Sequence, residues 1–175
     1  LEFDKQQLFE SNAIAEFLDE MVPPQLHPED PVKRARNRAW TDYVPTFSPA
    51  LGKITYCKSR EAMDEDWPAV EKAVQPLETA LTDERSEAGP YFNGSRLSLM
   101  DAAYAPFLQR FIRVDKFLKS GFLNSFPKLK AWAETLAFDP VVVAALSPEF
   151  DTAYKDNLKR REAFVATLLS EEDVV

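Results

Sequence analysis

The feature that most constrains this chain is the junction at Ser98, where a polar helix start is followed by a long apolar run. Ser98 and Asp101 have the S-x-x-D spacing of a capping box, in which the hydroxyl accepts the Asp101 backbone N–H and the carboxylate accepts the Ser98 N–H. From Leu99 to Leu108 every residue except Asp101 is apolar, small, or a Tyr or Pro. Because such a run has no polar face, the sequence predicts a helix that starts at Ser98 and whose first half is buried on all sides.

Proline divides the chain before this helix. Several prolines in 23–31 predict a stiff linker over residues 23–30 and a domain boundary. Asp30 followed by Pro31 is typical of a cap and first helical turn, so a helix is expected to begin there. The helical spacing of apolar residues continues to Ile54, and Pro45 and Pro49 are expected to kink that helix.

Further helices are predicted on both sides of the central one. Residues 67–81 carry an apolar face at helical spacing, with a kink at Pro76. Helices are also expected from Pro127, over 141–146 after Asp139-Pro140, and from Asp151 through Leu168. The chain is therefore predicted to be mainly all-α.

The first 22 residues have a different pattern. Residues 1–3 and 7–10 predict two short strands of a hairpin. Ser11 is expected to cap the helix that follows. In that helix the spacing predicts an inward apolar face of Ile14, Phe17, Leu18 and Met21, and an outward acidic face of Glu16, Asp19 and Glu20.

Composition excludes several classes of function. The chain has 175 residues, 45% of them hydrophobic, and a net charge of -8, which argues against general binding to nucleic acid or anionic membranes. No apolar run approaches the roughly 20 residues needed to span a bilayer. A single cysteine, Cys57, fits a reducing compartment, and with His27 as the one histidine no metal site is expected. These features favour a cytoplasmic protein whose partners are small molecules or proteins.

Two segments resemble the glutathione transferase family. The run Phe92-x-Gly94-x-x-Leu97-Ser98-x-x-Asp101, followed by Ala-Pro-Phe-Leu, resembles the capping motif and buried sixth helix of its C-terminal domain. Residues 8–18 are similar to the last strand and third helix of its thioredoxin-like domain.

The resemblance covers nearly the whole chain and implies its domain organisation. Residues 1–22 would be the C-terminal portion of the thioredoxin-like, glutathione-binding domain, residues 23–30 the linker, and residues 31–175 the all-α C-terminal domain. It also implies that the native polypeptide is longer than 175 residues. The thiol-activating Tyr, Ser or Cys of the family would lie before Leu1, so no catalytic residue is assigned.

Glu10 and Ser11 are the sharpest candidates for a binding site. A hydroxyl and free backbone N–H groups at a helix start suit a carboxylate, and a neighbouring carboxylate suits an ammonium. Together they would hold the α-amino acid end of a ligand, and the resemblance implies that this is the γ-glutamyl end of glutathione. The alternative is that Ser11 only caps the helix and Glu10 is a solvated strand end.

An aromatic stripe offers candidates for a second substrate. From the residues alone, Trp40, Tyr43, Val44 and Phe47 at helical spacing favour a core role. The resemblance implies instead that Tyr43, Val44 and Phe47, with Tyr104, are walls of a hydrophobic-substrate site.

Four basic residues stand together in this acidic chain: Lys33, Arg34, Arg36 and Arg38. They are interpreted as a solvated face. The alternative is a dimer contact with Glu16 or Glu20 of a second copy, since the resemblance implies a homodimer.

The resemblance predicts a glutathione transferase that presents the glutathione thiolate to a small hydrophobic electrophile, by conjugation or by glutathione-dependent thiol reduction. One alternative is a non-catalytic binding or scaffold protein of the same fold. Another is an unrelated helical bundle, into which residues 1–21 would pack.

Overall fold

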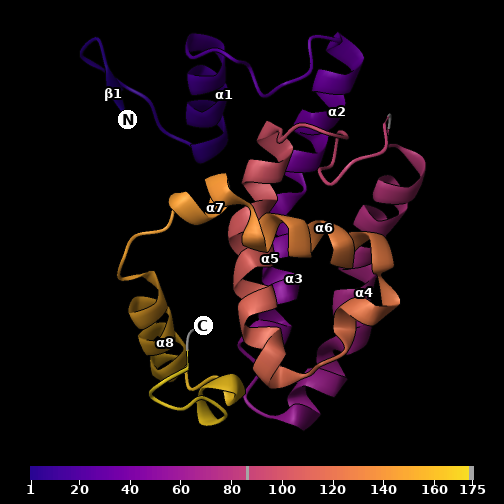
Figure 1. Ribbon diagram of the computed structural model, residues 1–175, viewed down its shortest axis with the longest axis vertical. Helices are drawn as coiled ribbons and strands as arrows, with labels where there is room; N and C mark the ends of the chain where they lie inside the picture. The colour runs from indigo at the N-terminus through magenta and orange to yellow at the C-terminus, as the bar shows by residue number, and fades with distance from the viewer. Residues whose placement is uncertain (86, 174–175) are drawn as a thin grey trace.

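The computed structural model describes residues 1–85 and 87–173 and shows a predominantly helical chain with one short hairpin (Figure 1). The elements in chain order are β1 (Glu2–Phe3), β2 (Gln6–Gln7), α1 (Ser11–Met21), α2 (Pro31–Asp42), α3 (Val44–Thr55), α4 (Arg60–Asp83), α5 (Leu99–Leu118), η1 (Phe122–Ser125), α6 (Pro127–Phe138), α7 (Pro140–Ala144), α8 (Phe150–Arg160) and η2 (Phe164–Thr167). The predicted mainly all-α architecture, preceded by a hairpin and a helix, is confirmed.

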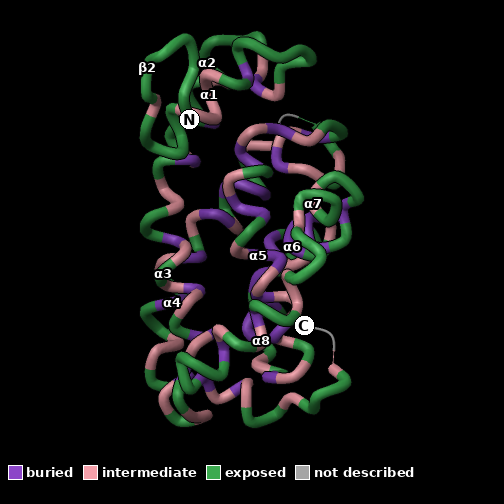
Figure 2. The backbone as a smooth tube through the Cα atoms, turned by 90° about the vertical axis from the view of Figure 1, so that its left-hand side faces the viewer, coloured by how far each residue is buried: buried purple, intermediate pink, exposed green. Residues whose placement is uncertain are grey.

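Helix α5 is the centre of the bundle, packed against α2, α3, α6 and η2. In Figure 2 the buried backbone is concentrated along this helix and its neighbours. Its inward residues, among them Met100, Tyr104 and Phe111, have no exposed surface. The expectation that its first half is buried on all sides is wrong, because Ala102 and Pro106 are exposed. These two residues lie one turn apart, on a stripe that neighbouring helices leave uncovered.

The capping box at Ser98 is confirmed, and its carboxylate does more than cap. Asp101 Oδ2 accepts from the Ser98 backbone N–H at 2.8 Å and from its hydroxyl at 2.5 Å. Asp101 Oδ1 accepts from the backbone N–H of Phe92 at 2.8 Å and from Trp132 Nε1 at 2.7 Å. One fully buried side chain therefore joins the loop before α5, the start of α5 and the middle of α6.

The segment 31–55 is divided rather than merely kinked. Asp30 accepts the Lys33 N–H and Pro31 opens α2, as predicted, but the helix ends at Asp42. Tyr43 separates α2 from α3, with Pro45 in the first turn of α3. Proline has no N–H to donate, so the ladder of hydrogen bonds is interrupted at this point.

The last predicted helix also ends early, at Arg160. Glu162 adopts a positive φ of 51°, and its N–H donates to the Lys159 carbonyl at 2.8 Å, while the Ala163 N–H donates to the Leu158 carbonyl at 3.0 Å. This pair of bonds is a Schellman motif, which terminates a helix. The chain then forms η2, where the Phe164 N–H donates to the Cys57 carbonyl at 2.7 Å.

The hairpin and α1 lie outside the core. Residues 1–22 contribute nothing to the main buried hydrophobic cluster of the described chain. The predicted inward face of α1 is partly wrong, because Leu18 and Met21 are 45% and 53% exposed while Asp19 is buried. Asp19 is buried because its carboxylate accepts the backbone N–H groups of Leu26 and His27, where the linker folds back onto α1.

Replacing Asp101 should therefore destabilise the protein far more than losing a cap. Asp101→Ala leaves the Trp132 and Phe92 N–H groups buried without their acceptor and should lower the free energy of unfolding by about 3 kcal/mol. Ser98→Ala removes only the hydroxyl and should lower it by about 1 kcal/mol. Urea denaturation of both variants measures the difference; equal losses would contradict the central role of the carboxylate.

Candidate functional site

A cleft of about 340 Å³ separates α1 from the bundle. One wall is the first half of α1, which contributes Ser11, Asn12, Ala15 and Glu16. The other walls come from Thr41 of α2, Val44 of α3 and the stripe of α5 formed by Leu99, Ala102, Ala103, Pro106 and Phe107. The cleft therefore has a polar side on α1 and a largely apolar side on the bundle.

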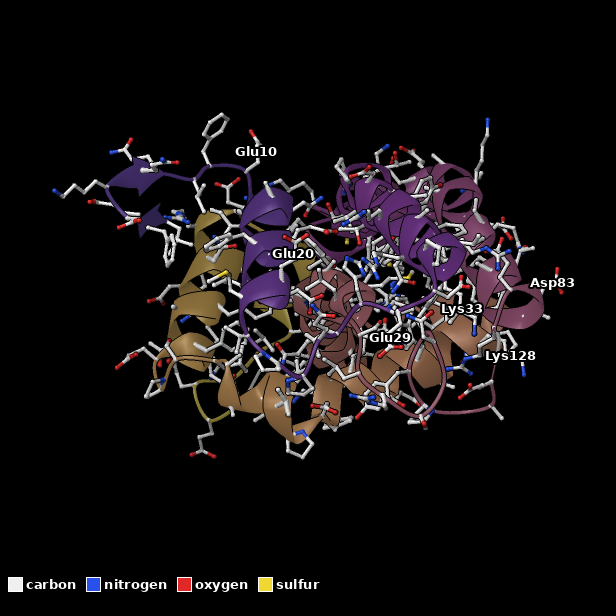
Figure 3. All side chains as sticks on the ribbon, turned by 90° about the horizontal axis from the view of Figure 1, so that it is seen from above. Glu10, Glu20, Glu29, Lys33, Asp83 and Lys128 are labelled. Carbon is white, nitrogen blue, oxygen red and sulfur yellow. The ribbon has the colours of Figure 1, made fainter. Side chains whose placement is uncertain are left out.

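Ser11 lies at the polar side, but it does not cap α1 as predicted. The N-cap position is Glu10, with φ 66°, and no side chain caps this helix within the described structure. Ser11 is the first helical residue, and both Glu10 and Ser11 are exposed. Figure 3 shows Glu10 projecting outward at the start of α1. The first turn of a helix also leaves backbone N–H groups without an intrahelical acceptor, so donors are available beside the Ser11 hydroxyl.

Of the four residues expected at the hydrophobic wall, the structure brings Val44 into the cleft. The Tyr43 hydroxyl donates to the Ala73 carbonyl of α4 at 3.0 Å. Phe47 and Tyr104 have no exposed surface, and their ring centroids lie 5.1 Å apart. These three side chains pack in the bundle, a role that helical spacing favoured for Tyr43 and Phe47 and that the apolar run favoured for Tyr104.

The Tyr104 hydroxyl has a structural partner. It donates to the Trp40 carbonyl of α2 at 2.7 Å. Burial raises the pKa of Tyr104 well above its ordinary value, so this phenol stays protonated at physiological pH. It therefore serves to join α5 to α2.

An ion-pair cluster lies at Glu16 in the middle of α1, within one chain rather than between two copies. Glu16, which lines the cleft, accepts from Arg38 Nε at 3.0 Å and Nη2 at 2.5 Å. His27 Nε2 lies 2.7 Å from the Glu16 carboxylate. The Arg38 guanidinium, which donates the stronger set of hydrogen bonds, holds the pKa of Glu16 at about 2. Glu16 therefore fastens α1 to both the linker and α2.

The basic residues of α2 are largely engaged within the chain. Arg38 binds Glu16, Arg36 lies 3.3 Å from Glu84, and Arg34 donates to the carbonyls of residues 28 and 29. Lys33 is exposed. The Glu16 carboxylate that was considered for contact with a second copy thus has its arginine partner in the same chain.

Residues 1–85 and 87–173 give little support for a reactive cysteine or a metal site. Cys57 is buried, and desolvation raises the pKa of its thiol above the ordinary value, which disfavours the reactive thiolate. Within that range no group of three or more His, Cys, Asp or Glu side chains is arranged to hold a metal ion. None of the helices described has the length and apolarity to cross a membrane.

Comparison with known proteins agrees with this architecture. Residues 60–135 match the family model described as "Glutathione S-transferase, C-terminal domain". The chain is 29% identical over 154 residues to glutathione S-transferase U16 of Arabidopsis thaliana, a match that covers 85% of this chain and 65% of that relative. The chain thus spans less than two thirds of this relative's length.

Solved structures of the same family superpose on most of the chain. The Tau class glutathione S-transferase of mango, Mangifera indica, is 27% identical and gives a TM-score of 0.68 over 89% of this chain and 73% of that one. Rice GST1, solved in complex with glutathione, is 25% identical and gives a TM-score of 0.65 over 89% of this chain and 70% of that one. Together with the family-model match, these similarities in sequence and fold support a relationship of the chain to the glutathione S-transferase family.

The ion pair at Glu16 predicts a pH-dependent contribution to stability. Its folded-state pKa of about 2 lies below the ordinary 4.5, so the stabilisation is complete above about pH 4.5 and is lost as the pH falls toward 2. Because Arg38 is about half exposed, Glu16→Gln should cost only about 1 kcal/mol at pH 7.

Thermal unfolding of wild type and Glu16→Gln between pH 7 and pH 3 measures this. The gap in melting temperature should narrow below pH 4.5. Glu20→Gln, an exposed position on the same helix, is the matched control and should have little effect. A gap that stays constant with pH would contradict the ion-pair contribution.

Proposed function

We propose that this chain takes part in binding glutathione and presenting its thiolate to a small hydrophobic electrophile, by conjugation or by glutathione-dependent thiol reduction. The observation that carries the proposal is that Ser11 and the apolar stripe of α5 line one cleft. This arrangement supports the proposal, because a polar side that would anchor the peptide lies next to an apolar side that would receive the second substrate.

The peptide would be held at the start of α1. The Ser11 hydroxyl and the first-turn N–H groups suit the α-carboxylate of the γ-glutamyl end, because helix N-termini favour anions. Glu10, the preceding residue, suits its ammonium. The rice relative binds glutathione, which supports this choice of ligand. The group that would lower the thiol pKa is assigned to no residue of this chain.

The electrophile would lie against the bundle side of the cleft. Val44, Ala103 and Phe107 give this side an apolar surface, and the volume of about 340 Å³ is at the small end of ligand pockets. Holding thiolate and electrophile together in such a cleft contributes to rate through proximity and orientation.

Ser11→Ala in the native full-length protein should weaken glutathione binding about tenfold, the effect of losing one hydrogen bond to a charged group. Stability should be unchanged, because Ser11 caps nothing. Ser147→Ala, also at an exposed serine, is the matched control and should bind glutathione normally. Calorimetric titration measures both, and equal affinities for the two variants would remove Ser11 from the site.

Filling the apolar side should separate the two substrates. Ala103→Phe reduces the cleft volume and should raise the KM for an aromatic electrophile several-fold while glutathione affinity is retained. Steady-state kinetics with the two substrates varied in turn measures this, and an unchanged KM would place the electrophile elsewhere.

A preliminary step separates the transferase from a scaffold of the same fold. The native full-length protein is captured on glutathione-agarose and then assayed with a general aromatic electrophile. If the protein is not retained on the resin and shows no turnover, the non-catalytic alternative is favoured.

A further inference from the structure

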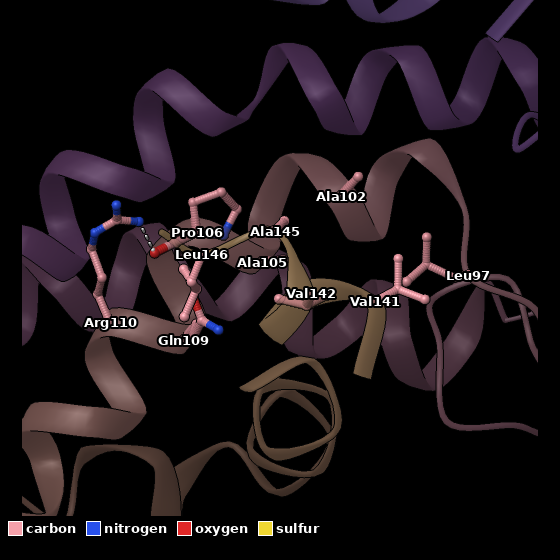
Figure 4. A pocket seen from close by; sticks show the side chains of 10 residues that line it. All are labelled: Leu97, Ala102, Ala105, Pro106, Gln109, Arg110, Val141, Val142, Ala145 and Leu146. Atoms are coloured by element: carbon pink, nitrogen blue, oxygen red, sulfur yellow. Dashed lines mark hydrogen bonds between the residues drawn. The ribbon is translucent and has the colours of Figure 1, made fainter. Parts of the chain in front are cut away.

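A second cavity of about 310 Å³ lies between α5 and the segment that contains α7 (Figure 4). Its lining is mainly aliphatic and comprises Leu97, Ala102, Ala105, Pro106, Gln109, Arg110, Val141, Val142, Ala145 and Leu146. It adjoins the α1 cleft along α5, because Ala102 and Pro106 border both. Ser11 and the other α1 residues do not line it.

One lining residue has an unmet hydrogen-bonding group. Gln109 is 1% exposed, and among the residues that the structure describes its Nε2 has no hydrogen-bond partner. A buried amide donor without an acceptor is costly, and most such groups in folded proteins are paired. Figure 4 shows the Gln109 amide among the aliphatic side chains of the pocket. The α5 wall of the pocket therefore contains one unmet donor, which lies just beneath the accessible surface.

The neighbouring cation is already engaged. Arg110 Nη1 donates to the Pro106 carbonyl at 2.6 Å, and its guanidinium lies 5.2 Å from the centroid of the Phe150 ring. Arg110 thus has partners in the chain, whereas the Gln109 amide has none; this amide is a neutral donor, and it matches a neutral acceptor such as a carbonyl oxygen.

Helix α7, which covers one side of the pocket, buries little of its surface. Helix α7 spans only Pro140–Ala144, and none of its described residues is buried. Its start is fixed by Asp139, whose Oδ1 accepts the N–H groups of Val141 and Val142 at 2.8 and 3.1 Å. An element with so little buried surface opens at low free energy, which gives a small molecule a way in.

We propose that the α5–α7 pocket binds a small, neutral, mainly apolar carbonyl compound whose oxygen accepts the Gln109 Nε2–H. The aliphatic walls supply affinity by burying the apolar body, and the amide supplies selectivity for the carbonyl. The pocket adjoins the proposed glutathione cleft but contains none of its α1 residues, and its binding does not depend on the proposed function.

A matched pair of probes tests the selectivity. 1-Indanone and indane share a two-ring skeleton and differ in the carbonyl. By calorimetric titration, the wild-type chain should bind 1-indanone at least about fivefold more tightly than indane. In an NMR titration, 1-indanone should shift the side-chain amide signal of Gln109 and indane should not.

Gln109→Leu should abolish that preference. This substitution keeps the volume and removes the unpartnered donor, so the variant should fold and have a raised melting temperature. Equal affinities of wild type for the two probes, or a preference that survives in Gln109→Leu, would overturn the proposal.

Two filling variants locate the binding. Val142→Trp occupies the α5–α7 pocket and should remove binding of both probes. Ala103→Phe fills the α1 cleft and should leave both affinities unchanged. The reverse pattern would assign the probes to the α1 cleft and overturn the proposal, whereas failure of the glutathione experiments would leave this result untouched.

Discussion

The buried carboxylate of Asp101 is the interaction on which the rest of the structure depends. A carboxyl group with no exposed surface is tolerated only when hydrogen bonds within the protein replace those it would make with water. Here the replacement comes from Ser98, from the backbone of Phe92 and from the indole of Trp132. The same bonds fix where α5 begins and how α6 crosses it, so the axis of the bundle and the apolar stripe beside the α1 cleft are positioned together.

Much of the fold could be predicted from local chemistry. The start of α2 at Asp30 and the capping box at Ser98 depend on residues three positions apart, and the structure contains both. The break at Tyr43 and the Schellman motif at Glu162 were missed, for different reasons. A proline permits either a kink or a break according to what packs around it, and a glutamate in a left-handed conformation carries no glycine signal.

The candidate site was less accessible to sequence reasoning. Spacing placed Phe47 on an apolar face, and the apolar run placed Tyr104 in a buried helix, but neither pattern distinguishes a wall that faces a cleft from one that faces another helix. Opposite charge suggested that the basic residues of α2 could meet Glu16 of a second copy, but only the packing of α1 against α2 shows that Arg38 pairs with Glu16 of the same chain. Gln109 likewise gave no signal, because only the packed structure shows an amide enclosed without a partner.

The hydrogen bond between the Phe164 N–H and the Cys57 carbonyl has a consequence for biosynthesis. It ties η2 to the loop that precedes α4, two segments separated by most of the helical bundle in sequence. During translation this hydrogen bond cannot form until residue 164 has been synthesised, and closing so long a loop carries an entropic cost. We therefore expect the end of the bundle where η2 contacts the loop between α3 and α4 to be the last part of the nascent chain to become ordered.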